Sequence, residues 1–118
     1  MNIFFYATYS NQEEFFHTLK KKFKNDKIFT INDNVDFSKI DVAMVWNLSN
    51  NIFKKMVNLK AIFSIGAGVD HILKLPNIGN LPIIRVKDPT MRIRMYNHVL
   101  SQILIFQLKL KIYDEAQR

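Results

Sequence analysis

Short apolar runs alternate along this chain with segments whose apolar residues recur every three or four positions. A nearly continuous apolar run is typical of a strand covered on both faces, whereas the longer period is typical of a helix packed on one side. The runs predict five strands, at residues 2–7, 27–31, 42–46, 60–65 and 83–86.

The intervening segments predict helices. After a Ser10–Glu13 pair that resembles a capping box, Phe15, Phe16, Leu19 and Phe23 share one face of a helix whose other face carries lysines. Two shorter helices are expected at residues 50–57 and 69–73. Pro76, Gly79 and Pro82 fill a loop, and Asp88-Pro89-Thr90 introduces a long last helix that runs to about Ala116.

Strands that alternate with helices predict an α/β fold, a doubly wound parallel sheet of about five strands. The flavodoxin-like strand order is the first choice among such sheets. We expect residues 1–118 to form a single domain, since they contain no repeat and no linker. The last helix is apolar on more than one side, so it should be covered both by the sheet and by something else.

The amino-acid composition argues against several classes of function. The chain has no Cys and only three scattered His, which argues against disulfides and against a metal site. Its net charge of +7 suits nucleic acid, acidic lipid or small anions, but no nucleic-acid-binding motif accompanies it. Without a signal peptide or an apolar run long enough for a bilayer, the protein is expected in the cytoplasm, not in a membrane.

The most distinctive local feature is the segment from Ser64 to His71, which reads as a strand end, a glycine-rich turn and a helix start. At such a place backbone N–H groups lack helical partners and favour an anion. The turn is not a dinucleotide fingerprint, because the third glycine of that pattern would fall on His71. A lone Gly-x-Gly is also common in purely structural turns, and both interpretations stay open.

Several segments in order resemble one family: Val45-Trp46, residues 59–63, residues 66–70, and Met91 with Ser101-Gln102. Together they resemble the glyoxylate/hydroxypyruvate reductase branch of the D-isomer-specific 2-hydroxyacid dehydrogenases, and specifically its amino-terminal, substrate-side portion. That family reduces small 2-oxoacids with NADH or NADPH. The resemblance therefore implies an α/β domain that binds a 2-oxoacid beside a nicotinamide cofactor.

The resemblance also implies roles for four residues. Ala67 and Gly68 would offer backbone amides to the substrate carboxylate. Trp46 would be an aromatic wall near the substrate, although a tryptophan that caps the sheet core is an equal alternative. Met91 would lie near the cofactor, although a methionine on an apolar helix more often only packs.

The family's catalytic groups have no counterpart in this chain. The Arg that polarises the substrate carbonyl, the His general acid, its Glu partner and the nucleotide-binding domain would all follow residue 118. We assign no catalytic residue: Arg85, Arg92 and Arg94 are not taken as substitutes, and none of the three histidines has a catalytic partner at a familiar spacing.

We therefore expect the chain to be inactive alone and to need NAD(P)H only as part of an intact enzyme, with a nucleotide-binding domain or a second copy as partner. The alternative is a stand-alone flavodoxin-like module that binds small anions.

Overall fold

The computed structural model describes residues 1–8 and 12–117, and it divides the chain into two compact units, Met1–Val86 and Lys87–Arg118. The proposed capping box begins at Ser10, which lies outside the described residues. Each unit is described by itself.

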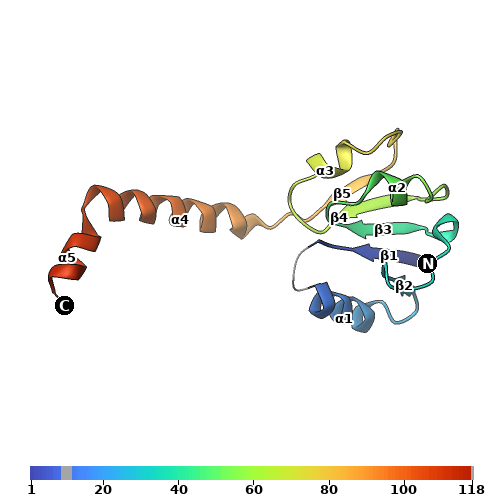
Figure 1. The fold of residues 1–118 in the computed structure, drawn as a ribbon, viewed down its shortest axis with the longest axis horizontal. Helices are drawn as coiled ribbons and strands as arrows, with labels where there is room; N and C mark the ends of the chain where they lie inside the picture. Colours follow the sequence, from blue (N-terminus) through green and yellow to red (C-terminus); the bar gives the residue numbers. More distant parts are fainter. Residues whose placement is uncertain (9–11, 118) are drawn as a thin grey trace. The chain divides into compact units, whose positions relative to one another are not determined.

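The first unit is built on a parallel sheet (Figure 1). Its strands lie in the order β2-β1-β3-β4-β5, which is the flavodoxin-like order that the sequence predicts. Each strand begins within one residue of its expected start. The strands are β1 (Asn2–Tyr6), β2 (Lys27–Phe29), β3 (Val42–Val45), β4 (Ala61–Ser64) and β5 (Ile83–Arg85).

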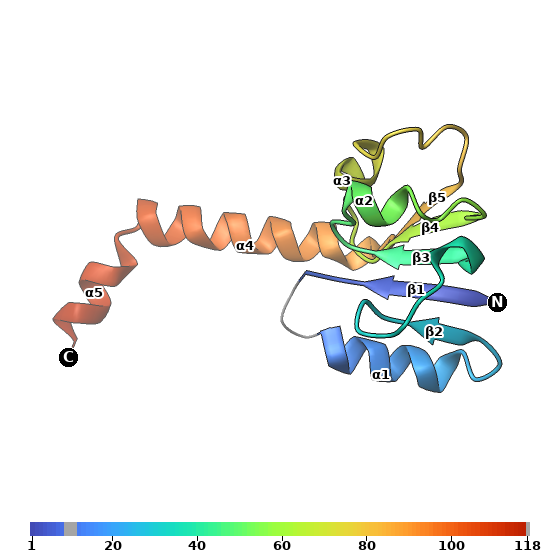
Figure 2. The same cartoon turned by 45° about the vertical axis from the view of Figure 1, so that its right-hand side comes forward.

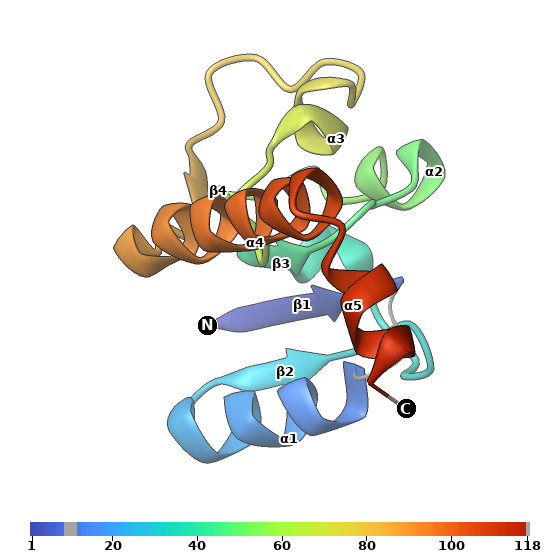
Figure 3. The ribbon, with the colours of Figure 1, turned by 90° about the vertical axis from the view of Figure 1, so that its left-hand side faces the viewer.

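Helices cover both faces of this sheet, and Figures 2 and 3 show α1 (Gln12–Lys22) on one side. There Leu19 packs on Phe5. On the other side, α2 (Asn50–Phe53), α3 (Asp70–Leu73) and the short helix η1 (Phe37–Lys39) surround a larger apolar cluster. The register explains this cluster, because Phe4, Ala43 and Ile62 lie side by side on three strands and are fully buried.

Strand β2 and helix α2 end earlier than the sequence predicts, because local hydrogen bonds end them. Strand β2 stops at Phe29, where the Asp33 carboxylate accepts from the Thr30 N–H at 2.6 Å and from its hydroxyl at 2.8 Å. Helix α2 stops at Phe53, since the N–H groups of Lys55 and Met56 turn to carbonyls three residues back. These bonds tighten the chain into turns.

The second unit contains α4 (Pro89–Gln107) and α5 (Leu110–Ala116). The Asp88 side chain caps α4 by accepting from the Thr90 N–H at 2.8 Å, as the Asp-Pro-Thr sequence predicts. The prediction of one helix to Ala116 is wrong. Lys109 takes a left-handed conformation with φ of 53°, and it interrupts the helix between Gln107 and Leu110.

No residue of α4 or α5 is buried. Large apolar side chains project from α4 into solvent, among them Phe106 at 88% and Ile93 at 60% exposure. The second unit by itself does not bury this helix, and the cover expected from the sheet and from something else stays a prediction. Despite this apolar character, none of the described helices combines the length and hydropathy that a bilayer crossing needs.

Candidate functional site

The predicted substrate residues of the first unit come together at one edge of the sheet. Trp46 follows β3 directly, and the turn Gly66-Ala67-Gly68 follows β4 after a single residue. Because the strands are parallel, both segments lie at the carboxyl edge, where open α/β sheets bind ligands. The structure thus brings together Trp46, Ala67 and Gly68, the three residues that the resemblance implies for substrate binding.

Trp46 is fixed in place by its backbone and by its ring. Its N–H donates to the Tyr6 carbonyl at 2.8 Å, and its indole packs against the His71 imidazole with ring centroids 4.4 Å apart. The same indole lies over Gly66, where an added Cβ would come within 2.4 Å of Trp46 Cζ3. Gly66 is therefore required by close packing against Trp46.

Half-buried Trp46 also contacts the smaller apolar cluster around Phe5. The indole thus packs on the core and also lies against the glycine turn. A contact with substrate stays a prediction.

Each carbonyl of the glycine turn accepts a hydrogen bond from the protein. The Gly66 carbonyl accepts from the Val86 N–H at 3.3 Å, the Ala67 carbonyl from Arg85 Nη1 at 3.3 Å, and the Gly68 carbonyl from Ser64 Oγ at 2.6 Å.

In a trans peptide the N–H points away from the preceding C=O, so the N–H groups of Ala67, Gly68 and Val69 point away from these donors. None of the three N–H groups has a partner among the described residues. Free backbone amides of this kind are available to donate hydrogen bonds to an anion.

His71 adds a neutral aromatic wall next to this turn. Burial lowers its pKa, and a hydrogen bond with the Val45 backbone and the nearby charge of Asp70 only partly oppose that effect. Its Nε2 atom is buried and has no hydrogen-bond partner within the described part of the chain. At neutral pH the imidazole is therefore uncharged and does not itself attract an anion.

Met91, the residue implied near the cofactor, belongs to the second unit. It is part of α4, where its side chain is 44% exposed. Its proposed cofactor contact stays a prediction.

The glycine turn does not fit the pyrophosphate of a dinucleotide. That role needs glycines so that the ligand can approach the backbone closely, whereas the open side of Gly66 is filled by Trp46. The third glycine position of such a loop holds His71, whose ring contacts the same indole. We therefore derive no step of a reaction through a nicotinamide cofactor from these residues.

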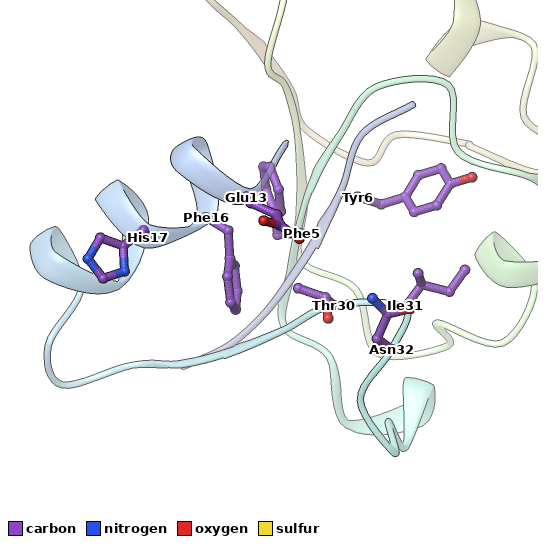
Figure 4. A pocket seen from close by; sticks show the side chains of 8 residues that line it. All are labelled: Phe5, Tyr6, Glu13, Phe16, His17, Thr30, Ile31 and Asn32. Carbon is purple, nitrogen blue, oxygen red and sulfur yellow. The ribbon is translucent and has the colours of Figure 1, made fainter. Parts of the chain in front are cut away.

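A cavity at the same sheet edge was not predicted from the sequence. This cavity of about 380 Å³ lies between α1, the end of β1 and the segment after β2 (Figure 4). Phe5 and Phe16 line it together with the polar residues Glu13, His17 and Asn32. Within residues 1–8 and 12–117, no three His, Asp or Glu side chains gather as they would around a metal ion.

Comparison with known proteins identifies sequence relatives of this chain. No protein-family model matches it. It is 30% identical over 125 aligned positions to glyoxylate/hydroxypyruvate reductase A from Serratia proteamaculans, with 99% of this chain and 38% of that protein covered. The protein of the same name from Yersinia enterocolitica is 27% identical, with 100% and 39% covered.

Solved structures agree with these relatives. A probable 2-hydroxyacid dehydrogenase from Rhizobium etli, in complex with NADP, HEPES and tartaric acid, matches with a TM-score of 0.75 and 30% identity over 99% of this chain and 38% of its own. An NADPH-dependent glyoxylate/hydroxypyruvate reductase from Sinorhizobium meliloti, in complex with NADP and sulfate, matches with a TM-score of 0.78 and 30% identity over 97% of this chain and 37% of its own.

Fold and sequence therefore relate this chain to the D-isomer-specific 2-hydroxyacid dehydrogenases. Within that class it is similar to the glyoxylate/hydroxypyruvate reductases, as its motifs predict. The chain spans about two fifths of the length of the relatives that it matches, 38% of the Serratia protein.

Proposed function

We propose that this chain forms the substrate side of an NADP-dependent 2-hydroxyacid dehydrogenase that reduces a small 2-oxoacid such as glyoxylate or hydroxypyruvate. The observation that supports this most is the row of unpartnered amides at Ala67, Gly68 and Val69 beside Trp46. The names of the relatives supply the substrate class, and the complexes with tartaric acid and sulfate show that two solved relatives were found with small anions.

In this proposal the turn binds the carboxylate end of the substrate. The Ala67 and Gly68 amides donate to its oxygens, and the Trp46 indole covers the short carbon chain. Hydrogen bonds to a charged group contribute about 1.5 to 3 kcal/mol each, so two of them correspond to a dissociation constant in roughly the millimolar range. Weak but saturable binding is the expected behaviour.

Reduction itself needs a hydride donor and a proton donor, and we propose that residues 1–118 supply neither. The imidazole beside the turn, His71, is neutral and has its Nε2 atom enclosed, so it offers no proton. The chain would bind and orient substrate, while a nucleotide-binding domain or a partner chain would carry NADP(H) close to Met91. The NADP in both solved relatives supports this division.

The test combines a size measurement with two assays on the same purified sample. Intact mass and light scattering define the species, NADPH consumption with glyoxylate measures turnover, and calorimetry measures binding of oxamate, a stable 2-oxoacid analogue. The proposal predicts oxamate binding without turnover by a species of 118 residues. Turnover by that species contradicts the inactive-alone part, and absence of oxamate binding at tens of millimolar contradicts the substrate-side part.

A stand-alone anion-binding module is the second candidate, because the first unit buries its own core and presents the turn without further residues. Selectivity separates the two candidates. A substrate site prefers oxamate to inorganic phosphate and sulfate, since Trp46 covers its carbon chain. A general anion module binds all three equally.

A further inference from the structure

We infer that Ser64 and Arg85 are the positioning residues of the glycine turn: they hold its carbonyl oxygens on the protein side, so that its amides face the substrate carboxylate. The inference rests on the proposed function, and it gives Ser64 and Arg85 a positioning role that neither the sequence pattern nor the relatives' names indicate. Ser64 and Arg85 are paired with each other at the ends of the neighbouring strands β4 and β5.

Ser64 acts from beneath the turn. It is 2% exposed, and its hydroxyl donates to the Gly68 carbonyl at 2.6 Å while accepting from the Gly66 N–H at 3.4 Å. One side chain thus connects both ends of the turn. An alanine here would leave the Gly68 carbonyl without its donor, and the following peptide, which carries the Val69 N–H, would be free to rotate.

Arg85 acts from the side. It ends β5, its side chain is exposed, and Nη1 donates to the Ala67 carbonyl at 3.3 Å. That bond sets the plane of the Ala67–Gly68 peptide and so the direction of the Gly68 N–H. Arg85 therefore lies behind the amide instead of touching the anion itself.

The charge of Arg85 gives it a second effect. It has no carboxylate partner among the described residues, whose ion pairs involve the amino terminus, Lys39 and Lys60. An unpaired guanidinium that close to the turn raises the local potential for an anion. A lysine would keep the charge but lose the planar donor geometry, whereas a methionine would lose both.

The test is titration of the ¹⁵N-labelled full chain with oxamate, followed by the amide signals of Ala67, Gly68 and Val69. We expect Arg85→Met to weaken binding roughly tenfold and Arg85→Lys roughly threefold, the size of a lost hydrogen bond with and without loss of charge. Arg92→Met removes the same charge from the second unit and serves as the matched control, with unchanged affinity.

Ser64 is tested in the same way. Ser64→Ala should weaken binding roughly three- to tenfold, and Ser64→Thr, which keeps the hydroxyl, should restore most of it. Because Ser64 is buried and its alanine variant can lose stability, the Arg85 variants decide the matter if it fails to fold. Urea unfolding accompanies each titration: a merely structural role lowers stability, whereas a positioning role lowers affinity in a variant of unchanged stability.

The outcomes separate this inference from the proposed function. If wild-type chain and Arg85→Met bind oxamate equally, with the same three amides shifting, the inference is wrong while the substrate site stands. If the wild-type chain binds no oxamate, the proposed function fails and the inference falls with it. Loss of affinity in Arg85→Met, partial retention in Arg85→Lys and no change in Arg92→Met support it.

Discussion

The two units of this chain bury their apolar residues very differently. The buried apolar residues of the described chain all lie between Ile3 and Leu75, inside the first unit, whereas α4 and α5 of the second unit bury none. Both units are rich in Ile and Leu. Apolar content therefore makes a core only where non-local contacts, here the parallel strand pairs, bring the side chains together.

The largest expected effect contrasts one residue from each unit. Ile62→Ala removes a fully buried side chain from the sheet core and should lower the free energy of unfolding by about 2 to 5 kcal/mol. Phe106→Ala removes a larger side chain that is 88% exposed and should change it by less than about 0.5 kcal/mol. Urea unfolding measures both. Equal losses would mean that α4 is packed in solution, and the comparison would fail.

The next effect tests the packing at the site. Gly66→Ala forces a methyl group into the Trp46 ring, at 2.4 Å, and should destabilise the first unit by about 1 to 3 kcal/mol. Gly68→Ala is the matched control, since its methyl group would lie 3.8 Å from the same ring. In a Trp46→Leu background the cost of Gly66→Ala should shrink. An unchanged cost would mean that Trp46 is not the reason for the glycine.

A smaller effect concerns pH and the imidazole of His71. Its folded pKa lies below the ordinary value of 6.5, so the unfolded chain takes up a proton first as pH falls. The stability of the first unit is fully present above that value and declines as pH drops through the interval down to the folded pKa. His71→Gln should remove most of the pH dependence of the free energy of unfolding in this interval, as measured by urea unfolding at several pH values. If the free energy of unfolding still falls with pH in the variant, the proton is taken up by another group.

Asp41 makes the stability of the first unit depend on pH in a lower range. Its carboxylate accepts from the Asn2 N–H at 2.8 Å and from Lys60 Nζ at 2.6 Å, and the first of these bonds is the main cause of its lowered pKa. Its contribution is present above the unfolded value of 3.8 and is lost as pH falls through the lower folded pKa. Asp41→Asn should therefore make the first unit less sensitive to acid below that value.

The smallest effect lies in the second unit, at Lys109. Its left-handed conformation suits glycine, so Lys109→Gly should stabilise the junction of α4 and α5 by less than about 1 kcal/mol. The matched change Lys111→Gly, inside α5, should destabilise that helix by about 1 kcal/mol. Far-ultraviolet circular dichroism should show a gain of helix content in Lys109→Gly and a loss in Lys111→Gly. If both changes lower helix content alike, Lys109 is helical in solution.

Much of the first unit could be predicted because its signals are local. Continuous apolar runs mark the strands, and their alternation with helices leads to the parallel sheet and its strand order. The ends of elements were less predictable, since β2 stops at a side-chain bond from Asp33 that propensity does not reveal. The break at Lys109 was missed because neither glycine nor proline stands there.

The candidate site was also predictable only in part from the sequence. The glycine turn and Trp46 could be placed from the sequence, because strand ends of a parallel sheet share one edge. The reason for Gly66 could not, since it depends on an indole from another strand end. Arg85 was equally hidden, because its contact with the Ala67 carbonyl depends on the register between β4 and β5.

The most direct test of the central claim is the map of amide shifts when oxamate is added to the wild-type ¹⁵N-labelled chain. We expect saturable shifts centred on Ala67, Gly68 and Val69, with a smaller shift of the Trp46 indole N–H and a dissociation constant in roughly the millimolar range. Shifts centred instead on Tyr6 and Asn32, in the cavity beside α1, or no saturable shift at all, would contradict it.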